Sequence, residues 1–438
     1  MIYEKPWEQG NLRISDNGRY LRNGDAPFFY LADTAWLLTQ VCDEKQARLY
    51  LTNRRDKGFT AIQATLIHRL PEMVRTNPAE EEKDPREPEY WVFVDKVLDM
   101  AEELGLYMAL LPAWGHVVQA GYVTMDNVDR YITFLAQRYG HRPNVIWLLG
   151  GDIRGDKYHD LYCREGQLFK QLNPDKLVGY HPFGRTSSSL WFHEEPWLDF
   201  NMFQSGHRRY DQATLGAWDD NRVDQETFFG EDNWRYVDRD LAREPAKPTV
   251  DGEPSYEQIL QGLHELSQPY WREWDVRRYA YWSVFQGAMG HTYGHNSIQQ
   301  FFHTPRIPGS FGVRYVWQDA IHHVGSEQMG ILRELMESVD YQSGRPATEL
   351  LMSPQGERYH RISVFAGADF LFAYDYLGEA FTLSLAPYAG RKLTASWFNP
   401  VSGRESFLAD VTGQDSVTVK PVARFTPDND WVLVIRAE

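Results

Sequence analysis

Two carboxylates in this chain each follow a short apolar run. Asp152 ends the run 144–152 (NVIWLLGGD), and Glu253 ends a second run at 248–253 (PTVDGE). A short, uninterrupted apolar run is typical of a buried parallel strand, whose two faces are both covered. Two carboxyl groups that meet across a pocket can cleave a glycosidic bond, because one protonates the leaving oxygen while the other attacks the anomeric carbon or activates water.

Each of these acids also has a purely structural interpretation. Asp152 is a good residue type for the N-cap of a following helix, where a side-chain oxygen accepts a backbone N–H. Glu253 could be held in an ion pair with an arginine. The sequence alone leaves both alternatives open.

A repeated strand-then-helix pattern surrounds the two acids. The predicted strands are 28–36, 59–67, 106–114, 144–152, 177–183, 198–206, 248–253 and 279–287. The predicted helices between them include 43–57, 89–104, 127–139 and 158–172, and a last helix is expected near 315–338. Eight such units predict an α/β protein, a (β/α)8 TIM barrel, over residues 27–340.

The two ends of the chain differ in pattern from this central part. Residues 1–26 alternate in polarity and turn at Asn17-Gly18 and Asn23-Gly24, which predicts a β-hairpin packed on the barrel. Residues 341–438 contain short alternating runs separated by Gly, Pro and Asp turns, which predicts a C-terminal antiparallel β-sandwich.

Active sites of parallel barrels lie at the C-terminal ends of the strands, so these positions supply the candidate site. We expect Asp152 and Glu253 to be catalytic. The residues expected to contact substrate are Asp33, Trp36, His68, Trp114, His181, Gln204, His291 and Tyr293, and His116 and His207 lie at the same level of the predicted strands. Acids, imidazoles, an amide and aromatic rings together suit a ligand rich in hydroxyl groups.

Composition narrows the class of partner. A net charge of -16 argues against nucleic acid or an anionic membrane, since both require a basic surface. The N-terminus has neither the basic nor the apolar segment of a signal peptide, so we expect a cytoplasmic protein. A metal-dependent hydrolase is an alternative because several histidines lie near strand ends, but YLADTAW on the first strand lacks paired imidazoles and no His-Glu-x-x-His motif is present. We therefore expect no metal and no cofactor.

Four motifs resemble one known family. FFYLADTAWLL, VIWLLGGD, DGEPSYE and GAMGHTYG are similar to segments of the apiosidase-like glycoside hydrolases, and the resemblance extends over about residues 10–435. It implies a barrel of the large retaining clan followed by a β-sandwich formerly called a collagen-binding domain. It also implies that Asp152 is the acid/base and Glu253 the nucleophile of a retaining mechanism. Many relatives have Asn-Glu at the fourth strand, where this chain has Gly151-Asp152.

The resemblance implies release of a terminal sugar, β-linked apiose, from plant-derived glycosides or pectin fragments. Arabinofuranose, galactose and xylose stay open as alternative sugars. A barrel that binds carbohydrate without catalysis is the alternative from another class of protein, and the presence of both acids disfavours it. The sequence does not indicate an oligomeric state.

Overall fold

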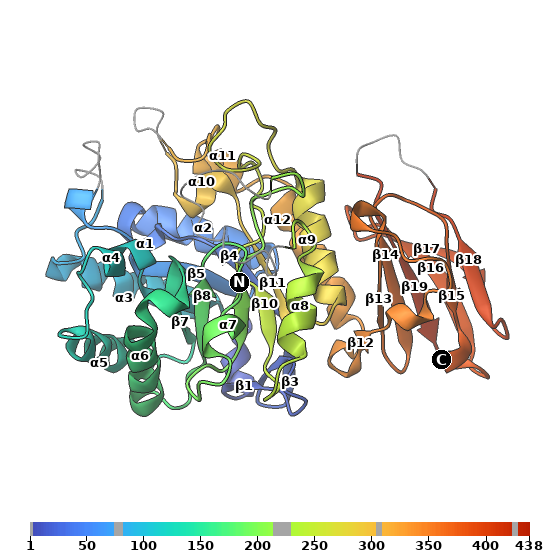
Figure 1. Cartoon of the computed structure of the whole chain (residues 1–438), viewed down its shortest axis with the longest axis horizontal. Coiled ribbons are helices and arrows are strands. Elements are labelled where there is room, and N and C mark those ends of the chain that lie inside the picture. Colours follow the sequence, from blue (N-terminus) through green and yellow to red (C-terminus); the bar gives the residue numbers. More distant parts are fainter. Residues whose placement is uncertain (1–2, 74–81, 213–228, 304–308, 423–427) are drawn as a thin grey trace.

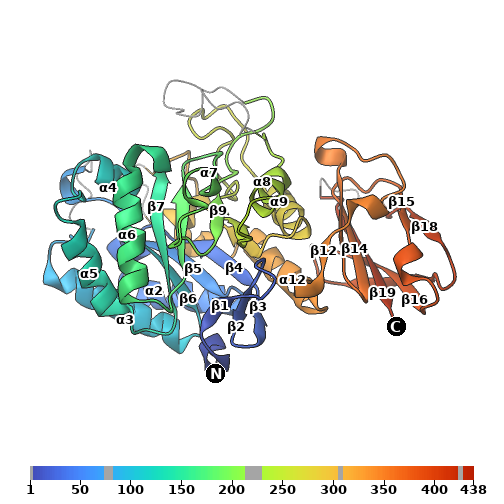
Figure 2. The same ribbon diagram turned by 60° about the horizontal axis from the view of Figure 1, so that its bottom comes forward.

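The computed structural model describes residues 3–73, 82–212, 229–303, 309–422 and 428–438. A large α/β part carries most of the chain, and an antiparallel sheet domain at the C-terminus lies beside it (Figures 1 and 2). None of the helices in these ranges is long and apolar enough to cross a membrane.

A curled parallel sheet forms the centre of the α/β part. Its strands are β4 (Tyr30–Thr34), β5 (Ala61–Ile67), β6 (Tyr107–Ala113), β7 (Val145–Ile153), β8 (Val178–Pro182) and β11 (Gly290–Tyr293), in the order β11-β4-β5-β6-β7-β8. Strand β11, the last of these six in sequence, thus pairs in parallel with β4, the first of the six. Nearly every residue of these strands is buried, as their continuous apolar runs predict.

Two further parallel strands, β9 (Asn201–Phe203) and β10 (Thr249–Asp251), pair with each other. Hydrogen bonds connect this pair to the larger sheet on both sides. The Asp199 N–H, just before β9, donates to the Val178 carbonyl of β8 at 2.9 Å. The Met289 N–H, just before β11, donates to the Thr249 carbonyl of β10, also at 2.9 Å.

Helices cover the outside of the parallel strands (Figure 1). They are α1 (Leu38–Val41), α2 (Glu44–Asp56), α3 (Pro88–Glu103), α4 (Gly115–Gln119), α5 (Val128–Tyr139), α6 (His159–Leu172), α7 (Ser189–Phe192), α8 (Trp234–Leu241), α9 (Glu273–Phe285), α10 (Asn296–Gln299), α11 (Trp317–Ala320) and α12 (Gly325–Glu337). The predicted helices at 43–57, 89–104, 127–139 and 158–172 are present as α2, α3, α5 and α6. The helix expected near 315–338 is divided into α11 and α12. Asp43 caps α2 through a capping box with Gln46, which explains where that helix begins.

The predicted strand at 279–287 is wrong. These residues belong mainly to helix α9, and the strand that pairs with β4 is β11, a few residues later. From Asp275 to Phe285, every residue of α9 is buried. A helix covered on all sides shows no polar face, so its sequence resembles a buried strand.

The antiparallel parts lie at the two ends of the chain. A 3₁₀ turn (Pro6–Gln9) precedes a three-stranded sheet of β1 (Leu12–Ile14), β2 (Leu21–Asn23) and β3 (Ala26–Phe28), where we had predicted a hairpin. The C-terminal domain has one six-stranded and one two-stranded antiparallel sheet. Their strands are β12 (Arg345–Pro346), β13 (Ile362–Ala366), β14 (Phe370–Asp375), β15 (Phe381–Ser384), β16 (Leu393–Phe398), β17 (Glu405–Asp410), β18 (Ser416–Val419) and β19 (Trp431–Ala437), of which β15 and β18 form the smaller sheet. One apolar core joins the two sheets.

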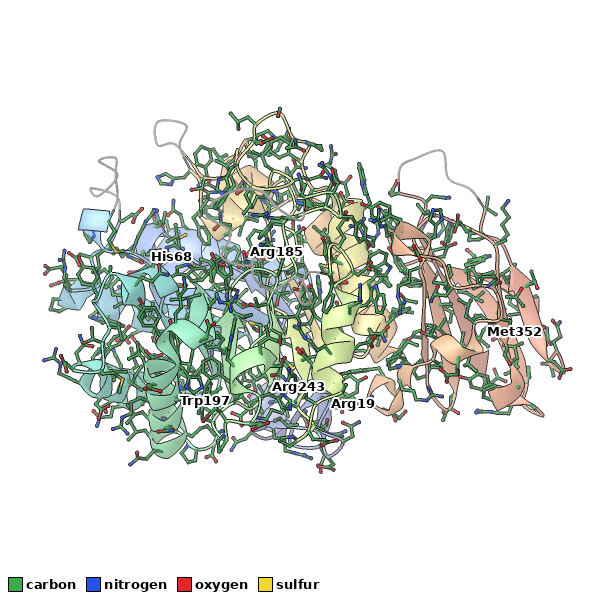
Figure 3. The ribbon with its side chains drawn as sticks, in the orientation of Figure 1. Arg19, His68, Arg185, Trp197, Arg243 and Met352 are labelled. Carbon is green, nitrogen blue, oxygen red and sulfur yellow. The ribbon has the colours of Figure 1, made fainter. Side chains whose placement is uncertain are left out.

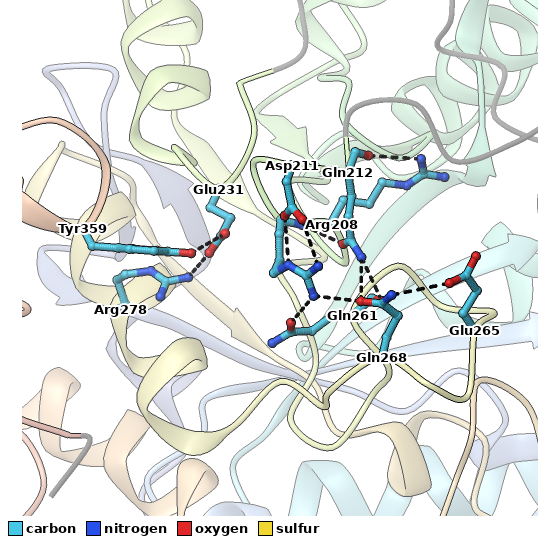
Figure 4. Close-up of polar contacts among 10 residues, drawn as sticks. Arg208, Asp211, Gln212, Glu231, Gln261, Glu265, Gln268, Arg278 and Tyr359 are labelled. Atoms are coloured by element: carbon cyan, nitrogen blue, oxygen red, sulfur yellow. Dashed lines mark hydrogen bonds and ion pairs between the residues drawn. The ribbon is translucent and has the colours of Figure 1, made fainter.

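Helix α9 is buried because the C-terminal domain packs on it. Arg277 forms a bidentate ion pair with Asp430, at 2.7 Å from Nε and 2.6 Å from Nη2, with both side chains fully buried. Arg278 binds Glu231, which also accepts a hydrogen bond from the Tyr359 hydroxyl at 2.6 Å (Figure 4). The interface is therefore fixed by charged groups whose partners come from both parts of the chain.

Candidate active site

A cavity of about 610 Å³ lies where the C-terminal ends of the parallel strands meet. It is lined by six of the residues that the sequence nominated, namely Trp36, His68, Trp114, Asp152, Gln204 and Glu253. These residues come from the ends of β4, β5, β6, β7, β9 and β10. His68 and Arg185 line the cavity, at the C-terminal ends of the strands, whereas Trp197 and Arg243 lie toward the opposite ends of the strands (Figure 3).

Asp152 is directed into the cavity by an irregular end of strand β7. Gly150, Gly151 and Asp152 all have positive φ angles, of 88°, 96° and 54°, and the register with β8 shifts at this point. A Cβ atom on Gly151 would lie 2.8 Å from the Trp114 ring, so glycine lets the backbone pass beneath that indole. Helix α6 has Tyr158 as its N-cap, so Asp152 does not cap it and the first structural alternative is wrong.

The surroundings of Asp152 favour its protonated form. Its side chain is exposed to the cavity, but protein surrounds the carboxyl group and removes much of the bulk water. This desolvation, followed by the negative charge of Glu253, raises the pKa of Asp152 to about 6. His181 and His207 oppose the shift without cancelling it. Asp152 can therefore hold a proton in mildly acidic solution and release it near neutral pH.

The surroundings of Glu253 favour its ionised form instead. His207 Nε2 lies 2.9 Å from its Oε1, and His181 Nε2 lies 3.2 Å from its Oε2. Desolvation raises the pKa of Glu253, but the two imidazoles outweigh it and lower the value to about 2. Within the part of the chain that the structure describes, the ion-pair partners of Glu253 are thus two histidines, which replace the arginine of the second structural alternative.

His181 connects the two acids. Its Nδ1 accepts the backbone N–H of Asp152 at 3.3 Å, which leaves the proton of the neutral ring on Nε2, the atom nearest Glu253. The ring also packs edge-on against Trp36, with centroids 5.0 Å apart. We had expected His181 to contact substrate, but its side chain is fully buried and does not line the cavity.

The chain after β9 fixes the other imidazole. The Gly206 N–H donates to the Glu253 carbonyl at 3.0 Å, and the His207 N–H donates to the Ser255 hydroxyl at 3.1 Å. His207 has a φ of 81°, a backbone conformation that few side chains adopt. These bonds to the segment after β10 set the position from which His207 reaches Glu253.

Aromatic rings form one wall of the cavity. Trp114 stacks on His68 with centroids 4.9 Å apart, and it packs at a tilt against Trp36 at 4.8 Å. The Trp36 indole N–H donates to the Tyr256 hydroxyl at 3.1 Å, which fixes the ring beside Glu253. Such faces pack well against the apolar side of a sugar ring.

Three more residues that we expected to contact substrate, in addition to His181, do not line the cavity. Asp33 lies 2.5 Å from Arg54 of α2, and Tyr293 donates its hydroxyl to Glu257 at 2.6 Å. His291 faces Ser283 of α9, with 3.2 Å between Nδ1 and the hydroxyl oxygen. Asp33 and Tyr293 are register partners on β4 and β11, and side chains alternate between the two faces of a strand. All three therefore point toward the helices.

Several cavity residues were missed or left without a role by the sequence interpretation, and His207, Tyr256 and Arg185 are examples. His207 was noticed at a strand end but received no function, Tyr256 was not nominated, and Arg185 was not among the residues expected to contact substrate. The motif DGEPSYE contained the signal for Tyr256, because a residue three positions after the acid can return to it through a turn. Arg185 has a φ of 62° and lies in the connection after β8, which no periodic pattern describes.

Comparison with known proteins defines the class. A solved structure described as a glycoside hydrolase has a TM-score of 0.90 and 36% sequence identity, covering 99% of this chain and 98% of its own. A glycoside hydrolase family 5 protein from Bacteroides vulgatus has a TM-score of 0.90 and 35% identity, covering 99% and 95% of the two chains. The two carboxylates in one cavity at the ends of parallel strands agree with this similarity. The chain is therefore a glycosidase.

The family follows from the match along the chain. The description "Apiosidase-like, catalytic domain" matches residues 15–343, and "Putative collagen-binding domain of a collagenase" matches residues 346–436. The protein belongs to the apiosidase-like family. A family 5 mannosidase from Rhizomucor miehei, at 13% identity and a TM-score of 0.52, shares the fold over 76% of this chain and all of its own. A search of curated proteins gave no match.

Proposed function

We propose that the protein is a retaining glycosidase in which Glu253 is the nucleophile and Asp152 the acid/base. The observation that carries this proposal is that Asp152 and Glu253 line one cavity, with imidazole nitrogens 2.9 and 3.2 Å from the two oxygens of Glu253. These surroundings shift the two pKa values in opposite directions, to about 6 for Asp152 and about 2 for Glu253. Two carboxyls whose surroundings shift their pKa values in opposite directions are suited to opposite roles.

In the first step, ionised Glu253 attacks the anomeric carbon while Asp152 gives its proton to the departing oxygen. In the second step, Asp152 takes a proton from water, and the water oxygen displaces Glu253 and releases the sugar. The imidazoles of His181 and His207 hold the carboxylate ionised before the attack and stabilise it again when it leaves.

The low pKa of Glu253 favours retention over inversion. An inverting enzyme would need this carboxylate as a general base, and a base with a pKa of about 2 accepts a proton poorly near neutral pH. The same carboxylate is a good leaving group from a glycosyl-enzyme. Asp152, with a pKa of about 6, exchanges protons readily in both steps.

We propose a small sugar at the chain end, β-linked apiose, as the group that is released from plant-derived glycosides or pectin fragments. The family match supports apiose, and a cavity of about 610 Å³ with an aromatic wall suits a short glycoside. Arabinofuranose, galactose and xylose are the competing sugars. A carbohydrate-binding protein without activity would have no need of two carboxyls with divergent pKa values.

We also propose that the eight parallel strands form one closed (β/α)8 barrel. The pairing of β11 with β4 and the hydrogen bonds on both sides of the β9–β10 pair support closure. The C-terminal antiparallel sheets would then form a β-sandwich that stabilises the barrel through helix α9.

The test is hydrolysis of a panel of aryl glycosides and apiosylated plant glycosides, followed by ¹H NMR of the first-formed anomer. We expect the apioside to be the best substrate and its product to keep the β configuration before mutarotation. A first product of inverted configuration would contradict the double displacement. A preference for another sugar would contradict apiose while leaving the mechanism intact.

A further inference from the structure

Among the described residues, three side chains of types that can bind a metal ion lie close together outside the cavity. His159 and Cys163 are on helix α6, and Glu195 follows helix α7. One ligand atom from each residue lies within 4.8 Å of the others. His159 and Cys163 are four positions apart, which places them on the same face of the helix in successive turns.

The distances fit a transition-metal ion. Cys163 Sγ lies 3.7 Å from Nδ1 and 3.8 Å from Nε2 of His159. Tetrahedral zinc with usual bond lengths to sulfur and nitrogen separates these two donors by about 3.6 Å. The donors are therefore already spaced for a shared ion, and a small rotation of the half-exposed imidazole would direct one nitrogen toward it.

The surrounding structure holds all three side chains near one another. The His159 ring stacks on Phe192 at a centroid distance of 5.1 Å. The backbone of Glu195 donates to Phe192 at 3.0 Å, and its carbonyl accepts from Lys247 Nζ, also at 3.0 Å. The segment that carries Glu195 is thus fixed relative to the ring that orients His159. A site assembled in this way loses little conformational entropy when an ion binds.

We propose that His159, Cys163 and Glu195 form a binding site for a zinc-like divalent cation, separate from the glycosidase cavity. One thiolate, one imidazole and one carboxylate are the ligands that zinc and cobalt accept, whereas calcium and magnesium require oxygen ligands. The bound ion joins the first two turns of α6 to the connection after α7, and solvent supplies the fourth ligand from the exposed side of His159. The site stabilises the fold and takes no part in sugar cleavage.

The test is a titration of the full-length, metal-free protein with Co²⁺, followed by the thiolate-to-cobalt charge-transfer band in the near ultraviolet. We expect one equivalent of Co²⁺ to produce the band and Zn²⁺ to abolish it. Cys163→Ser should remove the band, and His159→Gln and Glu195→Gln should each weaken binding at least about tenfold. Cys42→Ser is the matched control, because Cys42 is the other cysteine of the chain and lies far from these ligands in sequence.

A second measurement does not depend on the cobalt spectrum. Zn²⁺ should raise the midpoint of thermal unfolding of the wild type by more than that of His159→Gln at the same Zn²⁺ concentration, since stabilisation increases with affinity for the folded state. Ca²⁺ and Mg²⁺ should change neither. No band with the wild-type protein, an equal band in Cys163→Ser, or undiminished binding by Glu195→Gln would overturn the proposal. None of these readouts involves glycosidase activity.

Discussion

Two clusters of residues that each contain a pair of carboxyl groups lie near the ends of the parallel strands. One cluster is at the cavity, and the other faces the helices. The cavity cluster consists of Asp152, His181, His207 and Glu253. The helix-facing cluster consists of Asp33, Tyr50, Arg54, Glu257 and Tyr293. Each contains one aspartate and one glutamate, and the two glutamates are only four positions apart in the chain.

The difference between the clusters lies in what the carboxyls touch. In the helix-facing cluster, Asp33 accepts from the Tyr50 hydroxyl at 2.6 Å and pairs with Arg54, with both charges fully buried. In the cavity cluster, Asp152 reaches open space, and Glu253 has imidazoles at both oxygens. An enclosed acid that is paired with a buried arginine is costly to remove, whereas an acid that faces a cavity beside a charged neighbour can act on a ligand.

The largest expected effect is that of Glu253→Gln. The amide cannot attack the anomeric carbon, so we expect kcat to fall by roughly 10³-fold or more while the circular dichroism spectrum is unchanged. Steady-state hydrolysis of the best glycoside from the panel provides the measurement. Activity within about tenfold of the wild type would remove Glu253 from its role.

Asp152→Asn should have the next largest effect on activity. Loss of the general acid should lower kcat/KM by about 10² to 10⁴-fold for a poor leaving group, and by less for a nitrophenolate, which leaves without a proton. In the wild type, kcat/KM should fall as pH rises through about 6, because Asp152 must hold its proton to act as the acid. An unchanged alkaline limb in Asp152→Asn, or equal losses for both leaving groups, would contradict the assignment.

Asp33→Asn is the matched change in the helix-facing cluster. It leaves the Arg54 guanidinium buried without its charged partner, so the free energy of unfolding should fall by about 3–5 kcal/mol. Denaturant unfolding measures this loss. The folded enzyme should keep kcat within about threefold of the wild type, because Asp33 does not line the cavity. A large loss of kcat with normal stability would place Asp33 in the site after all.

Glu257→Gln should have the smallest effect and is the direct control for Glu253→Gln. Burial raises the pKa of Glu257 to about 7, so this side chain is substantially neutral near that pH, and an amide can still accept the Tyr293 hydroxyl. We expect the free energy of unfolding to change by at most about 1 kcal/mol, with kcat preserved. We would measure kcat for Glu253→Gln and Glu257→Gln side by side. A large loss in the first variant alone would show that only Glu253 takes part in catalysis.

Much of the fold was predictable from pattern. The apolar runs that ended in Asp152 and Glu253 are strands, and capping signals such as Asp43 located helix α2. The strand predicted at 279–287 failed because α9 is apolar on every side, and only the C-terminal domain packed on it explains why.

The sequence correctly predicted that Asp152 and Glu253 share one cavity, but it predicted the residues around them less well. Asp33 and Tyr293 carry the right chemistry at the right strand ends, but a shift of one position along a strand reverses the face that a side chain occupies. His207 depends on a left-handed backbone conformation after β9, and the role of Tyr256 depends on its hydrogen bond with Trp36. Long-range geometry of this kind leaves no periodic signal in the sequence.

The separation of the two carboxyl pKa values is tested most directly by ¹³C NMR titration of the carboxyl groups, with Asp152→Asn and Glu253→Gln used to assign the resonances. The account predicts a pKa of about 6 for Asp152 and about 2 for Glu253, with the Asp152 value falling in Glu253→Gln because the neighbouring negative charge is gone. An Asp152 that titrates in the ordinary carboxyl range, and does so equally in both proteins, would contradict it.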